Sequence, residues 1–252
     1  MKSVILCEGL DDVWFLGYLI HKWSDEKWAY KPKEKISSKY SLPVWRKNEK
    51  CEIYIRNSDR LAIWGVGGKD RLVEALEEID KINRYFQEDL LENIVIVSDR
   101  DQNEIAETLS PFEQKLKDLG LSVALSNNSK NKVTYEINDE HYSVFIYPII
   151  IPFNAKGALE TVLMTAISGD SKEDAFVVEE AKYYVSKIYE SGKVGKYLQH
   201  LRERLKAEFS SVISIINPTR STATFDELLM LHNWEENEHV RNQFKLLREI
   251  FI

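Results

Sequence analysis

The stretch SVILCEGLDD, residues 3–12, joins a short apolar run directly to a glutamate, a glycine and two aspartates. Apolar and polar side chains do not alternate in residues 3–7, which predicts a strand buried on both faces, as in the centre of a parallel sheet. From Asp11 onwards the apolar residues recur with a helical period, and aspartate is typical of a helix start because its carboxylate interacts favourably with the exposed N–H groups. The stretch therefore predicts a strand, an acidic turn and a helix, the first unit of an α/β fold.

The composition is that of a globular chain with an acidic balance. Of its 252 residues 44% are hydrophobic, and the net charge is −7, which argues against indiscriminate coating of nucleic acid. No stretch reaches the ~20 consecutive apolar residues of a membrane-spanning helix, and residues 1–7 run into acids instead of a signal-peptide cleavage site. Cys7 and Cys51, the two cysteines, have no metal-binding or disulfide spacing. We expect a cytoplasmic protein without a membrane partner.

Strand-like and helix-like segments alternate through the first two thirds of the chain. The second strong buried strand is NIVIVSDRD at 93–101, and it also ends in acids. Strands are also expected at 51–56, 61–68, 121–125, 132–137 and 142–151, and helices at 69–86 and 103–119. This alternation predicts a mainly parallel sheet flanked by helices.

The last third of the chain differs from the rest. From Gly157 onwards the pattern is helical, except for VISII at 212–216, which could form a strand. We therefore expect an α/β domain over 1–165, with an insertion around 24–50, and a helical C-terminal flank or cap over 166–252.

Acidic side chains follow three of the predicted strands. Glu8 with Asp12 follows the first, Asp99 with Asp101 follows the strand at 93–98, and Glu160 comes shortly after the strand at 142–151. Functional groups of parallel sheets gather at the carboxyl ends of the strands. Acids crowded there would repel one another unless a cation neutralised them. Ligands that are all oxygen favour a hard ion, Mg²⁺ or Mn²⁺, over zinc.

Two motifs in this order resemble a known family. Glu8-Gly9-x-x-Asp12 after the first strand, and Asp99-x-Asp101 after a later one, resemble the TOPRIM domain of topoisomerases, bacterial primases, recombination proteins and OLD-type (overcoming lysogenization defect) nucleases. GALE at 157–160 is similar to an element of the OLD-type nucleases. RERLKAEFSSVISIINP at 202–218 resembles the tail of small stand-alone TOPRIM proteins of unknown function. The resemblance covers roughly residues 1–165, and the tail more loosely.

The resemblance implies a TOPRIM-like fold and a Mg²⁺- or Mn²⁺-dependent nuclease acting on DNA or RNA. Glu8, Asp99 and Asp101 would be the core metal ligands, with Glu8 as a general base if a second ion binds. Asp12 and Glu160 would support a second ion or orient the first. Some relatives act against phages, so the expected partners extend to an ATPase or another defence-system chain.

Basic residues are expected to meet the phosphates of the nucleic acid. Lys206, with Arg202 or Arg204, would bring positive charge to the scissile phosphate. Lys69 in GVGGKD (65–70) is a further candidate phosphate contact, although that segment lacks the P-loop and dinucleotide patterns.

Plainer interpretations remain open for each group. Asp12 suits a helix cap, Asp99 and Asp101 suit a turn, and Glu160 suits the first turn of a helix. GVGGKD suits a strand-to-helix turn, and the basic residues at 202–206 suit a solvated helix face. The alternative function is a non-catalytic or regulatory nucleic-acid or nucleotide binder. A phosphatase is disfavoured, because Asn103 stands where that signature has threonine.

Overall fold

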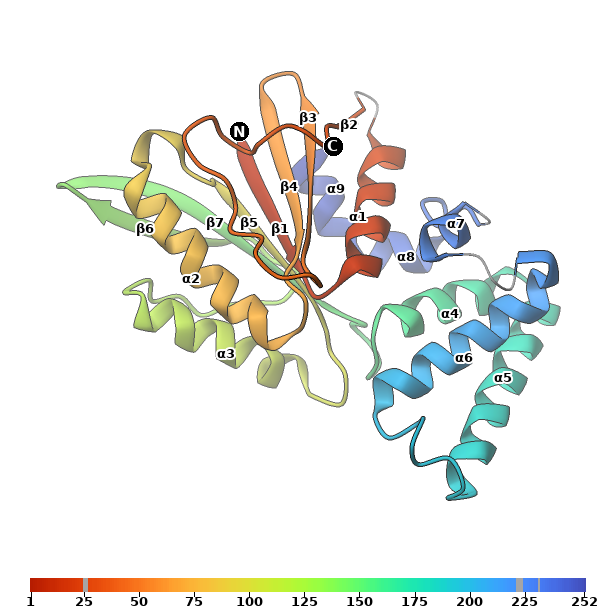
Figure 1. Cartoon of the computed structure of the whole chain (residues 1–252). Helices are drawn as coiled ribbons and strands as arrows, with labels where there is room; N and C mark the ends of the chain where they lie inside the picture. Colours follow the sequence, from red (N-terminus) through yellow and green to blue (C-terminus); the bar gives the residue numbers. More distant parts are fainter. Residues whose placement is uncertain (25–26, 221–223, 231) are drawn as a thin grey trace. The chain divides into compact units, whose positions relative to one another are not determined.

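The structure is a computed structural model that describes residues 1–24, 27–220, 224–230 and 232–252 (Figure 1). Within these residues one seven-stranded sheet has the order β2-β3-β4-β1-β5-β7-β6. The strands are β1 (Lys2–Cys7), β2 (Ala29–Tyr30), β3 (Lys50–Arg56), β4 (Asp59–Gly65), β5 (Asn93–Asp99), β6 (Asn131–Ile137) and β7 (Glu140–Ile151).

β1 lies in the interior of the sheet and pairs in parallel on both sides. Ile5 stands opposite Ile63 of β4 and opposite Val95 of β5. The pairs β2–β3, β3–β4 and β6–β7 are antiparallel, so the sheet is mixed, with its parallel part around β1. The predicted α/β class is confirmed, and so is the placing of segments 3–7, 61–66 and 94–98 in one sheet.

Helices pack on both faces of the sheet. α2 (Asp70–Tyr85) and α3 (Ile105–Asp118) share one apolar cluster with Leu6 and Trp64, which point to the same face. α1 (Leu10–Trp23) lies on the opposite face, where a Cβ at Gly17 would touch Ile63 and the Tyr54 ring. The continuous apolar run of β1 is therefore explained, because both of its faces are covered.

The insertion expected around 24–50 contributes to the core. Trp28, Ile36 and Tyr40 are buried. The indole Nε1 of Trp28 donates to the carbonyl of Phe251, 3.2 Å away, at the end of α9 (Lys245–Phe251). This contact joins the insertion to the C-terminal helix of the chain.

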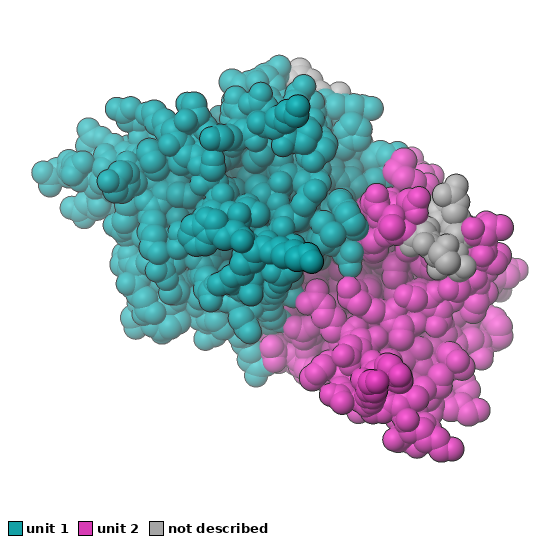
Figure 2. All heavy atoms as spheres, in the orientation of Figure 1, with its two compact units in different colours: residues 1–98, 105–150, 245–252 teal, residues 99–104, 151–244 magenta. Residues whose placement is uncertain are grey.

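The chain divides into two compact units that interleave along the sequence (Figure 2). Unit 1 comprises residues 1–98, 105–150 and 245–252, and unit 2 comprises residues 99–104 and 151–244. The division expected from the sequence, 1–165 and 166–252, differs from these units because it cuts the chain once, whereas each unit combines separate segments. The helices of unit 2 are α4 (Leu159–Asp170), α5 (Lys172–Glu190), α6 (Leu201–Ile216), α7 (Phe225–Leu229) and α8 (Glu238–Gln243).

Two predicted strands are wrong. Residues 121–125 form no strand, because the backbone N–H of Leu121 donates to the carbonyl of Leu116 and that of Leu125 donates to the Glu113 carboxylate. Residues 212–216 belong to α6, where Val212 and Ile213 extend a buried helical stripe. None of the helices in the described residues is long and apolar enough to cross a membrane.

Candidate functional site

Glu8 is buried at the carboxyl end of β1 in unit 1. The residue is only 3% exposed, and Ser98 Oγ donates a hydrogen bond to Glu8 Oε1 at 3.1 Å. Ser98 lies on β5, the parallel neighbour of β1. The hydroxyl holds the carboxylate in one orientation. This partner was not predictable from the sequence, since the contact depends on the pairing of β1 with β5.

A glycine-rich loop closes over the backbone of Glu8. The amides of Gly67 and Gly68 both donate to the Glu8 carbonyl, at 2.9 and 2.8 Å. Both glycines have positive φ, 83° and 143°, which favours glycine. A Cβ at Gly65 would lie 2.7 Å from the Gly9 carbonyl oxygen. The segment GVGGKD is therefore a strand-to-helix turn that also fixes Glu8, and its Lys69 is half-buried at the N-cap of α2.

Asp12 acts as a cap for the first helix. Its Oδ2 accepts a hydrogen bond from the Gly9 amide at 2.8 Å, and the residue is 8% exposed. This is the plain role that the sequence left open.

Asp99, in unit 2, is the last residue of β5 and meets the start of α4. Its Oδ1 accepts a hydrogen bond from the Leu159 amide at 3.0 Å, and the residue is 4% exposed. Arg202 Nη2 lies 3.9 Å from Asp99 Oδ2. A carboxylate at a helix N-terminus is stabilised by the exposed amides and the helix dipole.

Asp101 is held by its backbone to the turn before α4. Its amide donates to the Gly157 carbonyl at 2.7 Å, and the Gly157 amide donates back at 2.8 Å. Asp101 has a φ of 54°, a left-handed conformation that aspartate tolerates better than most residues. Arg100 ties the same loop down by donating to the carbonyls of Asn103 and Phe153.

Two of the three predicted basic residues each lie beside one of the predicted acids of unit 2. Lys206 Nζ is 3.9 Å from Glu160 Oε1, in the first turn of α4. Arg202, on the same helix as Lys206, lies beside Asp99 as described above. The Arg204 guanidinium lies over the Tyr189 ring of α5, 4.2 Å from the centroid, and its charge also acts on the Glu208 carboxyl group.

The donor chemistry of these residues fits a hard cation, since the buried carboxylates offer only oxygen. Among the residues that the structure describes, no three His, Cys, Asp or Glu side chains are grouped so as to hold a metal ion. Mg²⁺ usually needs fewer protein ligands, because it keeps several waters and takes one or two carboxylates together with substrate phosphates. Glu8 in unit 1 and Asp99 in unit 2 are buried carboxylates of this kind.

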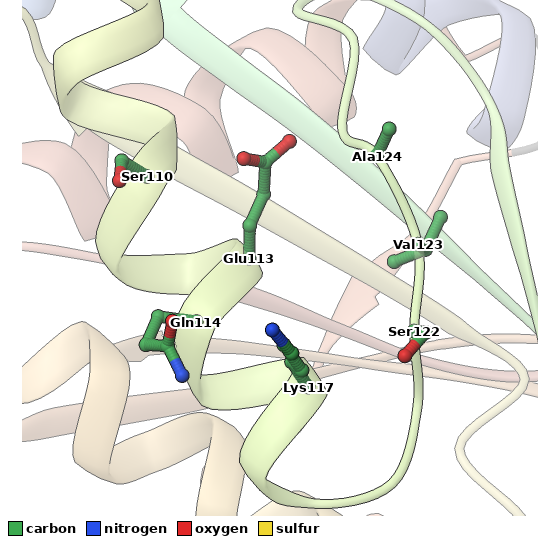
Figure 3. A pocket seen from close by; sticks show the side chains of 7 residues that line it. All are labelled: Ser110, Glu113, Gln114, Lys117, Ser122, Val123 and Ala124. Carbon is green, nitrogen blue, oxygen red and sulfur yellow. The ribbon is translucent and has the colours of Figure 1, made fainter.

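A hollow of about 480 Å³ lies away from these residues, between α3 and segment 122–124 (Figure 3). Glu113, Gln114 and Lys117 line it from the helix. The Glu113 carboxylate already accepts the Leu125 amide at 2.7 Å. This hollow contains none of the predicted site residues.

Comparisons with known proteins identify a family and a fold. A family model described as "Protein of unknown function (DUF3226)" matches residues 2–251. No curated protein matches the chain significantly. The crystal structure of hypothetical protein PH0156 from Pyrococcus horikoshii OT3 is similar over 98% of this chain and 100% of that chain, with a TM-score of 0.50 and 16% sequence identity.

Proposed function

Since the chain belongs to the DUF3226 family of proteins of unknown function, we propose a function from its own side chains: a Mg²⁺-dependent nuclease that hydrolyses phosphodiester bonds in DNA or RNA. The TOPRIM-like motifs at Glu8 and Asp99 are the sequence basis of this proposal. Cleavage in phage defence, beside an ATPase or another defence-system chain, is the biological setting that the resemblance suggests.

One observation supports the proposal most. β1 and β5 are parallel neighbours, and each is followed or ended by a buried carboxylate, Glu8 and Asp99. Burying an ionised carboxylate costs several kcal/mol unless it is paired. A bound divalent cation would offset that cost further, beyond what the Ser98 hydroxyl contributes at Glu8 and what the Leu159 amide and Arg202 contribute at Asp99.

The chain's own residues would divide the work as follows. Glu8, oriented by Ser98, and Asp99, oriented by the Leu159 amide, would hold the ion. Arg202 and Lys206 would bind phosphate oxygens when nucleic acid displaces them from their present acidic neighbours. Asp101 would be a further metal ligand, Asp12 and Glu160 would support a second ion or orient the first, and Lys69 would bind a neighbouring phosphate. When bound, the ion would lower the pKa of a coordinated water and stabilise charge on the phosphate.

A second candidate is a nucleic-acid binder without cleavage. It is favoured by two basic side chains that partly neutralise the acids: Arg202 lies 3.9 Å from Asp99, and Lys206 lies 3.9 Å from Glu160. In that case the acids would position Arg202 and Lys206 for binding, and no metal would be needed.

Cleavage of a nucleic-acid panel separates the two candidates. Plasmid DNA, single-stranded DNA and RNA are incubated with Mg²⁺ or Mn²⁺, with p-nitrophenyl phosphate as a control for phosphatase activity. The nuclease predicts cleavage that falls at least about 100-fold in Glu8→Gln and Asp99→Asn, in line with the loss of a metal or electrostatic group. Asp139→Asn, at an exposed turn in unit 1, is the matched control and should cleave normally. Binding without cleavage by the wild type would support the second candidate.

A further inference from the structure

The connection between α5 and α6 is cationic in an acidic chain. Residues 187–206, called here the basic connection, contain six basic residues and two glutamates, while the whole chain carries a net charge of −7. The basic residues are Lys187, Lys193, Lys196, Arg202, Arg204 and Lys206. In Figure 1 the segment links the neighbouring ends of α5 and α6 within unit 2.

The two glutamates of the basic connection are engaged locally. Glu190 accepts a hydrogen bond from Ser186 Oγ at 2.8 Å, and Glu203 accepts one from the His200 amide at 3.0 Å, which caps α6. In the described part of the chain neither Lys193 nor Lys196 forms an ion pair, and both are exposed. The charges of Lys193 and Lys196 therefore face solvent, while Arg202 and Lys206 lie beside acids of the same unit.

Exposed aromatic rings accompany these cations. Tyr197 is 66% exposed, and Lys196 Nζ lies 5.4 Å from its ring centroid. Tyr189 is 41% exposed and carries the Arg204 guanidinium over its ring. A large exposed aromatic side chain costs hydrophobic free energy, and the face of the Tyr197 ring turned away from Lys196 is suited to stacking.

Cations interleaved with exposed rings match the chemistry of single-stranded nucleic acid. Its backbone is attracted by lysine and arginine, and its unpaired bases offer faces that stack on aromatic side chains. In a duplex those faces are already stacked and do not reach a tyrosine. A protein partner fits less well, because lysine is depleted from protein–protein interfaces.

We propose that the basic connection binds a single-stranded segment of DNA or RNA, with Tyr197 stacking on a base and Lys193 and Lys196 binding phosphates. The same segment continues into Arg202 and Lys206, which lie beside Asp99 and Glu160 within unit 2. A nucleic-acid strand bound along this segment would thus reach Asp99 and Glu160. The inference rests on the proposed function for its substrate class and adds a preference for unpaired strands.

Binding is measured without cleavage, by fluorescence anisotropy of labelled single-stranded and duplex oligonucleotides in chelator over a range of salt concentrations. The wild type should bind the single strand more tightly than the duplex. The double variant Lys193→Ala/Lys196→Ala should reduce the slope of log K against log [salt] by about 1.4, since each phosphate contact to a single strand contributes about 0.7. Tyr197→Ala should weaken binding by about 5- to 100-fold with an unchanged slope, because it removes stacking and no charge.

Matched substitutions elsewhere serve as controls. Tyr85→Ala removes a ring that is 85% exposed on α2, and Lys132→Ala removes an exposed lysine on β6. Neither should change affinity or slope. Equal binding of single strand and duplex, or Tyr197→Ala with wild-type affinity, would overturn the inference. Concentration-dependent self-association that Tyr197→Ala abolishes, with no oligonucleotide binding, would instead make the segment an interface between copies and would also overturn it.

The two proposals fail in different ways. Cleavage by the wild type with no effect of the Lys193, Lys196 or Tyr197 substitutions on binding would overturn this inference and leave the nuclease standing. Single-strand binding that these substitutions weaken as stated, with no cleavage under any condition, would support the inference and overturn the nuclease.

Discussion

Gly67 is the residue whose backbone most constrains the surroundings of Glu8. Its φ of 83° is left-handed, and a Cβ there would lie 2.6 Å from Asn48 Nδ2. Gly67→Ala should therefore lower the free energy of unfolding by about 1–2 kcal/mol or more, from backbone strain and the clash together. Urea unfolding of the wild type and the variant measures this change in the free energy of unfolding. Gly169→Ala, in α4, is the control, because a Cβ there would meet no atom of another part of the chain within 4 Å, and the substitution should be neutral or stabilising.

Glu208 gives unit 2 a predicted pH dependence. Partial burial raises the pKa of its carboxyl group, while Lys182 and Arg204 act in the opposite direction. A raised pKa in the folded state means that folding favours the protonated acid. This stabilisation is present below the unfolded pKa of about 4.3 and is lost as pH rises through the folded pKa.

Glu208→Gln should accordingly raise the melting temperature at pH 7–8 and leave it unchanged near pH 4, where the wild-type acid is neutral as well. Thermal melts across this pH range make the measurement. Glu180→Gln, at an exposed position of α5, should show no such difference. A Glu208→Gln protein less stable than wild type at pH 8 would contradict the assignment.

At the scale of single residues, the sequence identified acids but not their partners. Glu8 and Asp99 stood out because each follows an apolar run. Ser98 and Gly67, which hold Glu8, did not, because their contacts arise from the pairing of β1 with β5 and from the loop after β4. Arg204 had the same predicted role as Arg202, and only the packing of α6 on α5 separates them.

The C-terminal helix α9 is the element whose stabilising role is most direct to test. Phe251 is fully buried, and its ring lies edge-on to Trp28 at a centroid distance of 6.1 Å. Phe251→Ala should cost about 3–5 kcal/mol of the free energy of unfolding, while its backbone carbonyl can still accept from Trp28 and Arg56.

Tryptophan fluorescence during urea unfolding reports this loss, because five of the six tryptophans belong to unit 1. Ile252→Ala, at a residue that is 47% exposed, should change the free energy of unfolding by no more than about 0.5 kcal/mol. Equal stability of the Phe251→Ala and Ile252→Ala variants would show that α9 does not stabilise unit 1.

Predictions of elements succeeded where periodicity and hydrogen bonding agree. The helices at 70–85 and 105–118 follow clear amphipathic patterns. In 121–125 the apolar pattern was right, since Leu121 and Leu125 are buried, but their amides bond to α3 instead of a strand. In 212–216 a β-branched run suggested a strand, yet Val212 and Ile213 continue the helical spacing of Leu205 and Phe209.

At the scale of the whole molecule, chain order and spatial order differ. The sequence predicted an α/β part followed by a helical part, and both architectures are present. Their boundaries were not predictable, because residues 99–104 join the helical unit and residues 245–252 return to the α/β unit. Such returns depend on contacts like that of Trp28 with Phe251, which join segments 223 positions apart.

The central claim is that Glu8 and Asp99 serve a divalent cation instead of the fold. Calorimetric titration with Mn²⁺, in the presence of a non-cleavable oligonucleotide, tests it on the wild type, Glu8→Gln and Asp99→Asn, with melting curves in chelator for each. We predict that the wild type binds Mn²⁺ and that both variants lose binding, while their metal-free melting temperatures stay unchanged or rise slightly, because a buried charge has been removed. Wild-type protein that binds no Mn²⁺ at millimolar concentration, or variants that melt earlier yet bind Mn²⁺ normally, would contradict the account.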